Sequence, residues 1–377
     1  METYKSLKVY FGDRQVGTLA MYQRQLVAFE YAEEWLANGF AISPFALPLI
    51  KKLYIPKYDP FDGLFGVFSD SLPDGWGRLL VDRMLAKERI EPSKVDMLNR
   101  LAIAGEATMG ALTYRPQHKW SFADTSSEYD RLANECIKIL ESEYSDDLDE
   151  LFRIGGSSGG ARPKILTKID GEDWIVKFHT TTDRKDSGEI EYRYSECAKK
   201  CGITMSETRL FSSKQCAGYF GTKRFDRQTL QAGNKKRVHM LSVSALLEVS
   251  HRTPSLDYNS LMKLTLELTK DYSEVEKMYR LMCFNVFAHN RDDHSKNFSF
   301  LYDETQNRWT LSPAYDLTYS SSFGGEHATC INGNGLNPEA EDLLAVAKHI
   351  GLAKTKATQI AQLVQQTVHE ELSDILP

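Results

Sequence analysis

Three oxygen-bearing side chains in the C-terminal half of the chain have the types and spacing of a phosphoryl-transfer site: Asp292, Asn297 and Asp316. Four residues separate Asp292 from Asn297, the spacing at which the catalytic loops of kinases place a base and a metal-binding amide. Carboxylate and amide oxygens are, with phosphate oxygens, the ligands that Mg2+ prefers. The pattern predicts that Asp292 acts on the proton of an attacking hydroxyl group, while Asn297 and Asp316 bind Mg2+.

The segment between the two expected metal ligands can bring them together. Two strand-like runs, residues 298–302 and 308–311, are joined by the polar turn 303–307. An antiparallel hairpin starts and finishes on the same side. We therefore expect Asn297 and Asp316 to lie close to one another.

Two other interpretations of the loop remain open. Asp, His and Asn are common in turns, so the stretch could be an ordinary polar loop. It could also hold a metal ion through four side chains, although no cysteine lies nearby: His289, Asp292, Asp293 and His294. A capping-box pattern at Asp271 and Glu274 predicts a helix that runs to about Ala288. Phosphoryl transfer is favoured because such a helix would position the loop.

A glycine-rich stretch, residues 155–160, could approach nucleotide phosphates with its backbone amides. It matches neither a Walker A motif nor G-x-G-x-x-G, so taken alone it favours a flexible Gly-Ser linker. The next runs, residues 164–169 and 174–178, predict a hairpin that places Lys177 inside an apolar strand. A buried ammonium group is costly unless paired, which favours a phosphate-binding lysine over a lysine on an edge strand.

Residues 292–297 and 313–317 resemble the catalytic motifs of the HipA-type serine/threonine protein kinases, a family of bacterial toxin kinases. The resemblance extends over nearly the whole chain and is strongest in these two motifs. It implies four roles in this part of the chain: a catalytic base at Asp292, Mg2+ ligands at Asn297 and Asp316, and a position close to the transferred phosphate for His294.

The resemblance also implies an ATP-binding N-lobe. Lys177 would bind the α- and β-phosphates and pair with Glu191 on a helix predicted over residues 189–201, although Glu189 could serve instead. Residues 219–227 resemble the last strand of the N-lobe and the hinge that reads adenine. The other expected nucleotide contacts are Ser157, Ser158, Gly159, Gly160, Lys223 and Phe225.

The two adjacent serines of the glycine-rich stretch are candidates for the autophosphorylation that the resemblance implies. Aligning on residues 160–164 favours Ser157 over Ser158. A phosphoserine carries about −1.5 to −2 charges at neutral pH and would repel the triphosphate of ATP. We therefore expect an activity that limits itself.

The biological setting follows from the resemblance alone. It implies a toxin–antitoxin system with a HipB-like helix-turn-helix antitoxin, so that DNA is contacted only through this partner. It also implies a translation-related protein substrate, such as an aminoacyl-tRNA synthetase. Two alternatives remain open: a small-molecule kinase with the same Asp, Asn and Asp groups, and a catalytically silent co-repressor of a DNA-binding partner.

Composition and charge limit the functions and cellular locations that remain possible. A net charge of −6 argues against direct binding of nucleic acid, although the basic run 234–237 could form a local patch. Six scattered cysteines without a Cys-x-x-Cys pair predict reduced thiols. No apolar run approaches the roughly 18 residues of a membrane span, and the N-terminus lacks an apolar signal core. We therefore expect a cytoplasmic protein.

The predicted fold class is α+β: a two-lobed protein-kinase-like fold with an N-terminal accessory α/β subdomain. A chain of 377 residues can form two or three domains, and it begins with a hairpin predicted over residues 7–11 and 15–20. The acidic stretch 141–150 indicates a boundary. We predict three parts: an accessory domain with its acidic linker, 1–147; a kinase N-lobe, 148–235; and a mainly helical C-lobe, 236–377.

Overall fold

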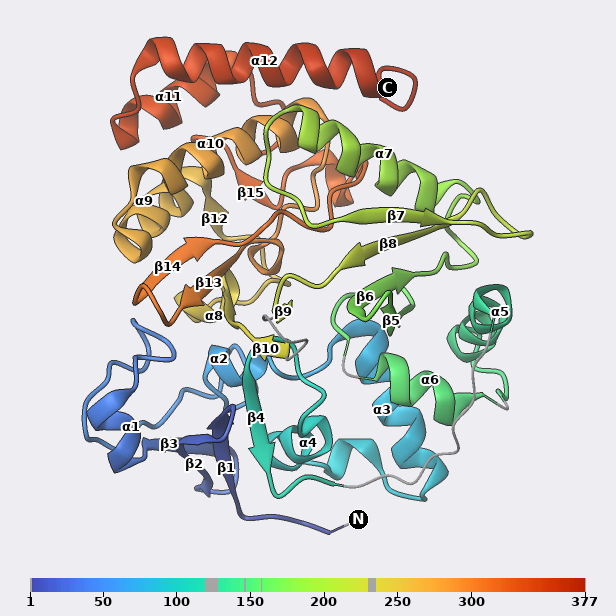
Figure 1. Cartoon of the computed structure of the whole chain (residues 1–377), viewed down its shortest axis with the longest axis vertical. Helices are drawn as coiled ribbons and strands as arrows, with labels where there is room; N and C mark the ends of the chain where they lie inside the picture. The colour runs from blue at the N-terminus through green and yellow to red at the C-terminus, as the bar shows by residue number, and fades with distance from the viewer. Residues whose placement is uncertain (1, 119–127, 146, 157, 230–234, 377) are drawn as a thin grey trace. The chain divides into compact units, whose positions relative to one another are not determined.

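The computed structural model describes residues 2–118, 128–145, 147–156, 158–229 and 235–376. The chain, coloured along its sequence in Figure 1, divides into two compact units. The first unit contains Met1–Lys185 and Phe211–Val249, and the second contains Asp186–Leu210 and Ser250–Pro377. Each unit is thus built from two separate stretches of sequence. The expected three-part division at residues 147 and 235 stays a prediction.

The first unit opens with an antiparallel sheet of strand order β3-β2-β1-β4. Leu7 lies opposite Leu19 and Phe11 opposite Arg14, so the predicted N-terminal hairpin is confirmed. Alternate residues of β1 are buried because one face of the sheet packs on the core. The elements of this part are β1 (Ser6–Phe11), β2 (Arg14–Tyr22), β3 (Leu26–Tyr31), α1 (Glu33–Asn38), α2 (Gly66–Ser69), α3 (Gly75–Lys87), η1 (Pro92–Lys94), α4 (Met97–Ala104) and β4 (Leu112–Arg115).

A second antiparallel sheet in this unit carries the predicted lysine. The hairpin predicted from residues 164–169 and 174–178 forms part of this sheet. It closes at Asp170 and Gly171, whose φ angles of 53° and 78° are those of a type I′ turn. Lys177 lies opposite Lys164 at the far end of the hairpin. The remaining elements of the first unit, in and around this sheet, are α5 (Tyr129–Leu140), α6 (Leu148–Gly155), β5 (Lys164–Ile169), β6 (Glu172–Lys177), β8 (Tyr219–Lys223), β9 (Arg227–Thr229), β10 (Lys235–Arg237), β11 (His239–Ser242) and α8 (Val243–Leu247).

One apolar cluster joins this sheet to three helices of the same unit. Trp76 of α3, Leu132 of α5 and Phe152 of α6 pack with Ile165 of β5 and Val176 of β6. Burial of apolar surface contributes about 25 cal/mol per Å2, so the cluster fixes the helices against the sheet. Trp76 is 1% exposed and anchors α3 in this cluster.

The second unit is mainly helical and holds a hairpin. β13 and β14 pair from Phe300–Leu311 to Asp303–Arg308, which confirms the hairpin predicted between Asn297 and Asp316. In Figure 1, α12 runs along α10. The elements are α7 (Ser187–Lys200), β12 (Leu256–Asp257), α9 (Tyr258–Thr269), α10 (Tyr272–Phe287), η2 (Ser295–Asn297), β13 (Ser299–Asp303), β14 (Arg308–Leu311), η3 (Phe323–Gly325), β15 (Thr329–Cys330), α11 (Ala340–Ile350) and α12 (Lys354–Leu372), while β7 (Thr208–Phe211) spans the boundary between the units.

The start of α10 differs from the predicted capping box. Asp271 does cap the helix, because its carboxylate accepts a hydrogen bond from Ser273 N at 2.8 Å. Glu274 does not return a bond to the cap. It instead accepts from Leu311 N at 2.8 Å and pairs with Lys277 at 2.7 Å. The pattern thus marked the correct helix start, but Glu274 holds α10 to β14.

The six cysteines, all within the described residues, form no disulfide, and four of them are buried. The four buried thiols pack inside the protein. Among the helices that the structure describes, none combines the length and the apolar character needed to cross a membrane.

Candidate active site

The loop between α10 and β13 carries the predicted catalytic residues. The chain leaves α10 through His289, whose φ of 50° lies in the left-handed region. Asn290 N then donates to the carbonyl of Asn285 at 2.9 Å, which turns the loop back onto the last turn of the helix. At the other end, the short helix η2 leads directly into β13. Both ends of the loop are therefore fixed by regular elements of the same unit.

The orientation of the Asn297 amide is set by the backbone of Asp292. Its Nδ2 atom lies 2.7 Å from the carbonyl oxygen of Asp292. A carbonyl oxygen can only accept, so the nitrogen of the amide must face it. The Oδ1 atom of Asn297 is consequently the one turned away from this bond, as a metal-binding amide requires.

Tyr315 links the residues around Asn297 to Asp316. Its hydroxyl donates to the carbonyl of Lys296 at 2.6 Å and bonds to Ser299 Oγ at 2.6 Å. The hairpin is closed nearby by a bond of 2.9 Å from Ser312 N to Ser299 O. Residues on both sides of Asn297 thus contact the residue before Asp316, as expected of a hairpin. Asp316 itself has a φ of 53°, an uncommon backbone conformation for a residue with a side chain.

The donor set of Asn297 and Asp316 fits Mg2+ chemically. It offers one amide oxygen and one carboxylate, and Mg2+ takes its remaining ligands from water and phosphates. The alternative site with His289, Asp292, Asp293 and His294 is not formed: the described residues contain no group of three or more His, Cys, Asp or Glu that could hold a metal ion. The physical reason is that the Asp293 carboxylate is buried and bonded elsewhere.

His294 lies beside the proposed base. Its Nδ1 atom accepts a hydrogen bond from Lys296 N at 3.3 Å, so the proton of a neutral ring is on Nε2. Nε2 lies 4.0 Å from Asp292 Oδ1. The side chain of Asp292 is 65% exposed, whereas that of His294 is 25% exposed. The carboxylate of Asp292 is therefore accessible to a substrate from outside.

A buried carboxylate supports the loop next to Asp292. Asp293 is fully buried, and its Oδ2 atom bonds to the hydroxyl of Tyr258 and to Nδ1 of His327, each at 3.0 Å. Its Oδ1 atom accepts from Thr329 N at 3.1 Å. Each carboxylate oxygen thus has a partner, which a buried charged group needs.

The hydrogen-bond network continues into α10. Asn285 Nδ2 donates to the hydroxyl of Tyr258, and Asn290 Nδ2 donates to Asn285 Oδ1, each at 2.9 Å. Burial raises the pKa of Tyr258 well above its usual value, and the neighbouring Asp293 raises it further. Tyr258 therefore stays a hydrogen-bond donor to Asp293.

The glycine-rich stretch begins at the last residue of α6 and then continues without regular secondary structure in its described residues. α6 runs to Gly155, and the hydroxyl of Ser158 donates to the carbonyl of Gly155 at 2.6 Å. Ser158 is buried, so this hydroxyl is engaged by its own segment. Ser157, the favoured autophosphorylation site, lies outside the described residues.

The remainder of the stretch is held by the start of α3. Gly160 N donates to Asp74, and the carbonyl of Gly160 accepts from Trp76 N at 3.0 Å. A Cβ atom at Gly77 would lie 2.2 Å from the carbonyl oxygen of Ser158, so only glycine fits there. No pattern in the sequence indicated that the start of α3 supports this stretch.

Lys177 and Lys164 share one end of the β5–β6 hairpin. Their Cα atoms are paired across the two strands. Lys177 Nζ lies 5.6 Å from the centre of the Phe220 ring, within the range of a cation–π contact. Lys164 is 6% exposed, and a Cβ atom at Gly160 would lie 2.7 Å from its Nζ atom. The sequence did not single out Lys164, which brings a second ammonium group next to Gly160.

The predicted hinge contains a buried ion-pair cluster. Lys223 pairs with Glu172 at 3.3 Å at the end of β8, and Phe225 follows it. Beside them, Asp226 binds Arg224 at 2.6 Å and Arg227 at 2.8 Å. Burial alone would raise the pKa of Asp226, but the guanidinium groups of Arg224 and Arg227 and the hydrogen bond from Gly110 N together lower the pKa to about 2. This carboxylate is a structural anion, which the sequence analysis missed.

The expected partners of Lys177 lie on α7. Glu191 is 2% exposed, whereas Glu189 is exposed. A buried carboxylate needs a partner more than an exposed one does, which favours Glu191 as the candidate. Lys177 belongs to the first unit and Glu191 to the second, so their pairing stays a prediction.

Comparison with known proteins identifies the family. Residues 7–115 match the HipA N-terminal domain, and residues 156–372 match the HipA-like C-terminal domain. The chain therefore belongs to the HipA family. Two curated relatives from Sinorhizobium fredii (strain NBRC 101917 / NGR234) are named "Putative kinase Y4dM" and "Putative kinase Y4mE".

These relatives share moderate similarity over most of the chain. The first is 24% identical over 74% of this chain and 68% of its own length, and the second is 25% identical over 85% and 79%. A chain of the solved Shewanella oneidensis MR-1 complex of the toxin–antitoxin proteins HipA and HipB with operator DNA has a TM-score of 0.71 at 18% identity. The match covers 98% of this chain and 91% of that chain. The predicted kinase-like α+β fold of HipA proteins is thereby confirmed.

Proposed function

We propose that this chain is an ATP- and Mg2+-dependent serine/threonine protein kinase of the HipA type. The observation that carries the proposal is the arrangement around Asn297. The nitrogen of its amide lies 2.7 Å from the carbonyl oxygen of Asp292. Tyr315, which directly precedes Asp316, donates a hydrogen bond to the carbonyl of the residue before Asn297. This arrangement supports the proposal that Asp292 is the base and that Asn297 and Asp316 bind the metal ion in phosphoryl transfer.

In the proposed reaction, Asp292 accepts or orients the proton of the substrate hydroxyl. The substrate oxygen forms a bond to the γ-phosphorus of ATP, while the bond from that phosphorus to the bridging oxygen breaks and ADP leaves. Asn297 and Asp316 would hold Mg2+, which neutralises negative charge on the phosphates when bound. His294, with its Nε2 proton directed toward Asp292, lies where it can contact the transferred group.

Residues of the expected kinase N-lobe would bind the rest of ATP. Lys177 would hold the α- and β-phosphates, and the backbone around Gly160 would approach them. Lys223 and Phe225 would contact the adenine edge. Lys164, which lies opposite Lys177 at one end of the β5–β6 hairpin, supports this proposal because its ammonium group supplies positive charge beside Gly160.

The partners follow from family membership. The solved relative is bound to HipB and operator DNA, so we propose a HipB-like antitoxin and contact with DNA through that protein. The proposed substrate is a translation-related protein, such as an aminoacyl-tRNA synthetase. Autophosphorylation would use Ser157, since the hydroxyl of the alternative Ser158 is buried and donates to Gly155.

Phosphoproteomics of a cell extract tests the function. The extract is incubated with Mg-ATP and the native protein, with Asp292→Ala, or with the control Asp303→Ala in the β13–β14 turn. We expect new phosphoserine or phosphothreonine sites with the native protein and the control, and none with Asp292→Ala. Phosphorylation confined to metabolites would establish a small-molecule kinase instead. Absence of any transfer, with retained binding of a helix-turn-helix partner, would indicate a silent co-repressor.

A further inference from the structure

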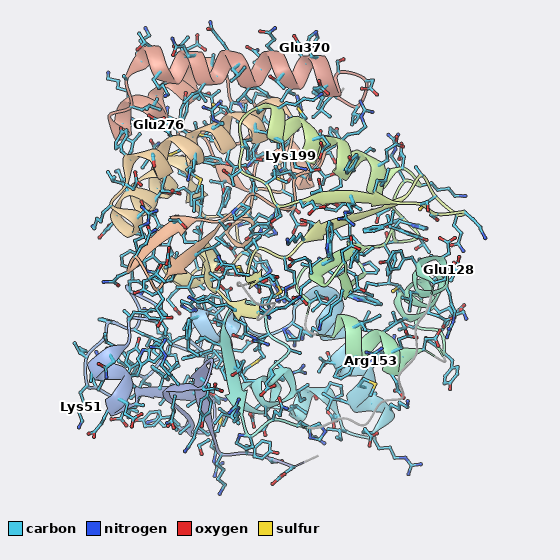
Figure 2. The ribbon with its side chains drawn as sticks, viewed as in Figure 1. Lys51, Glu128, Arg153, Lys199, Glu276 and Glu370 are labelled. Atoms are coloured by element: carbon cyan, nitrogen blue, oxygen red, sulfur yellow. The ribbon has the colours of Figure 1, made fainter. Side chains whose placement is uncertain are left out.

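A cavity of about 460 Å3 opens in the first unit beside β5; its lining includes Arg224 but none of the described residues that are expected to bind ATP. It lies among α5, α6 and β5, and the labelled Arg153 of α6 in Figure 2 is one of its lining residues. Four consecutive residues of one strand, 165–168, form part of its wall. Side chains of a strand alternate between its two faces, so four consecutive residues can share one cavity only along the edge of the strand.

The register of the hairpin shows which backbone groups face the cavity. A two-residue type I′ turn places Ile169 and Glu172 in a hydrogen-bonded pair, and such pairs recur at every second residue. A hydrogen bond of 2.8 Å from Phe178 N to Pro163 O agrees with this alternation of hydrogen-bonded and non-hydrogen-bonded pairs. Leu166 and Lys168 therefore direct their N–H and C=O groups away from β6.

These outward groups remain without a protein partner. Within the part of the chain that the structure describes, no hydrogen bond is made by the outward backbone groups of Leu166 or Lys168. At the beginning of the edge, the carbonyl of Lys164 accepts from Trp76 Nε1 at 3.2 Å. An open edge of this kind is a template for an added strand.

The side chains around the edge differ between the two faces of the sheet. Ile165 and Thr167 lie on the face of the apolar cluster, and Tyr129 and Leu132 of α5 line the cavity with them. Leu166 and Lys168 point to the opposite face. A strand added to β5 would therefore present alternate side chains to an apolar and to a polar surface.

Charge indicates what the polar face would accept. Two of the charged lining residues are already paired: Arg224 binds Asp226 at 2.6 Å, and Asp173 binds Lys235. Lys168 is exposed and has no ion-pair partner among the described residues. Asp173 lies opposite Lys168 on β6 but is bound to Lys235, so an acidic side chain on an added strand would give Lys168 a countercharge of its own, as in favourable cross-strand pairs.

We propose that the edge of β5 binds an extended segment of another protein, in which acidic and apolar residues alternate. The segment would bond to the N–H and C=O groups of Leu166 and Lys168. Its acidic residue would lie opposite Lys168, and the next residue would enter the cavity against Leu132. A peptide fits better than a small apolar ligand because unpaired backbone groups form part of the wall. This surface is separate from the proposed catalytic loop and does not depend on it.

Selection from a display library of random eight-residue peptides tests the proposal, with the full-length native chain as the target. Enriched peptides are synthesised and their Kd is measured by fluorescence anisotropy. Leu166→Pro removes an outward N–H that β6 does not use, which edge strands tolerate. We expect Leu166→Pro to weaken binding at least tenfold, while the matched control Leu166→Ala stays within threefold.

Two further measurements do not depend on the folding of the proline variant. N-methylation of alternate peptide amides should abolish binding to the native chain, and Lys168→Glu should change the selected residue from acidic to basic. Enrichment of no peptide, or of peptides indifferent to N-methylation and to both variants, would overturn the proposal. A native dimer that Leu166→Pro converts to a monomer would also overturn it, because the occupant would be a second copy of this chain.

Discussion

Asp293 Oδ2 lies 3.0 Å from His327 Nδ1, and both side chains are almost fully buried. The adjacent Asp292, by contrast, has an exposed carboxylate. The segment of His327 also binds the loop through its backbone, since Ala328 N donates to Arg291 O at 3.0 Å. The exposed acid that is proposed to act on substrate is therefore carried by a backbone fixed from the buried side.

The first prediction concerns His327 as a positioning residue. If the proposed kinase activity holds, His327→Ala should lower kcat by about 10–100-fold, the usual cost of removing a group that orients a site residue. The Kd of Mg-ATP should change less than threefold, because neither Asn297 nor Asp316 loses a contact. His349→Ala, an exposed histidine of the same unit, is the control, and both variants are compared by steady-state kinetics.

A structural role alone would give a different result. Loss of the His327 bond leaves Asp293 under-satisfied and should also reduce the free energy of unfolding by about 1–3 kcal/mol. His327→Gln, which retains a side-chain N–H donor, should recover part of kcat. Reduced stability with an unchanged kcat in His327→Ala would show that the contact stabilises the fold without positioning Asp292.

Alanine substitutions of Asp316 and Asp292 should differ in their effects on nucleotide binding and on phosphoryl transfer. Asp292→Ala should leave Mg-ATP binding within severalfold while abolishing transfer, since a base acts mainly in the transition state. Asp316→Ala should weaken Mg-dependent nucleotide binding as well, because it removes one of two proposed protein ligands. Titration calorimetry at several Mg2+ concentrations separates the two variants. Equal nucleotide affinity for the native protein and Asp316→Ala at every Mg2+ concentration would exclude Asp316 as a ligand.

The sequence predicted the elements that local patterns encode. Alternating apolar residues and a short turn determine each hairpin, with Asp170-Gly171 between β5 and β6 and a polar turn between β13 and β14, because strand pairing across a short turn depends on neighbours in the chain. The helix start at Asp271 followed from its capping chemistry. The candidate catalytic residues could be named for the same reason, since Asp292 and Asn297 occupy a single loop.

Contacts between distant parts of the chain could not be predicted. His327 reaches Asp293 across 34 positions, and no periodicity marks a lone histidine in an irregular segment. Glu274 was assigned to a capping box, but tertiary contact with Leu311 determines its partner. The cluster around Asp226 likewise depends on Gly110, whose N–H donates to it at 2.7 Å from 116 positions away.

Asp226 offers a test of stability that is independent of catalysis. Asp226→Asn removes the anion that compensates the buried guanidinium of Arg224 and the partly buried one of Arg227. Breaking a buried ion pair from one side costs about 3–5 kcal/mol, because an uncompensated charge remains. Urea unfolding should show a loss of this size, whereas Asp13→Asn in the exposed N-terminal turn should stay within about 0.5 kcal/mol. A small loss for Asp226→Asn would mean that the arginines find other partners.

Glu248 should make stability depend on pH. Burial raises its pKa from 4.5 to about 7, even though its Oε1 atom accepts a hydrogen bond from Gly66 N at 2.8 Å. In the unfolded chain the group ionises near its ordinary pKa of 4.5. Between these two values the folded state binds more protons than the unfolded state, so this group makes stability fall as the pH rises.

Glu248→Gln removes the ionisation while keeping an oxygen that can accept from Gly66 N. We expect it to raise the thermal unfolding temperature at pH 8, where native Glu248 is charged in its buried position, and to change it little at pH 5. Glu30→Gln, at an exposed position on β3, should have no such pH-dependent effect. Thermal melts of the three proteins from pH 5 to pH 8 provide the measurement. A gain for Glu248→Gln that is equal at both pH values would exclude the raised pKa as its cause, because only the charged form is penalised by burial.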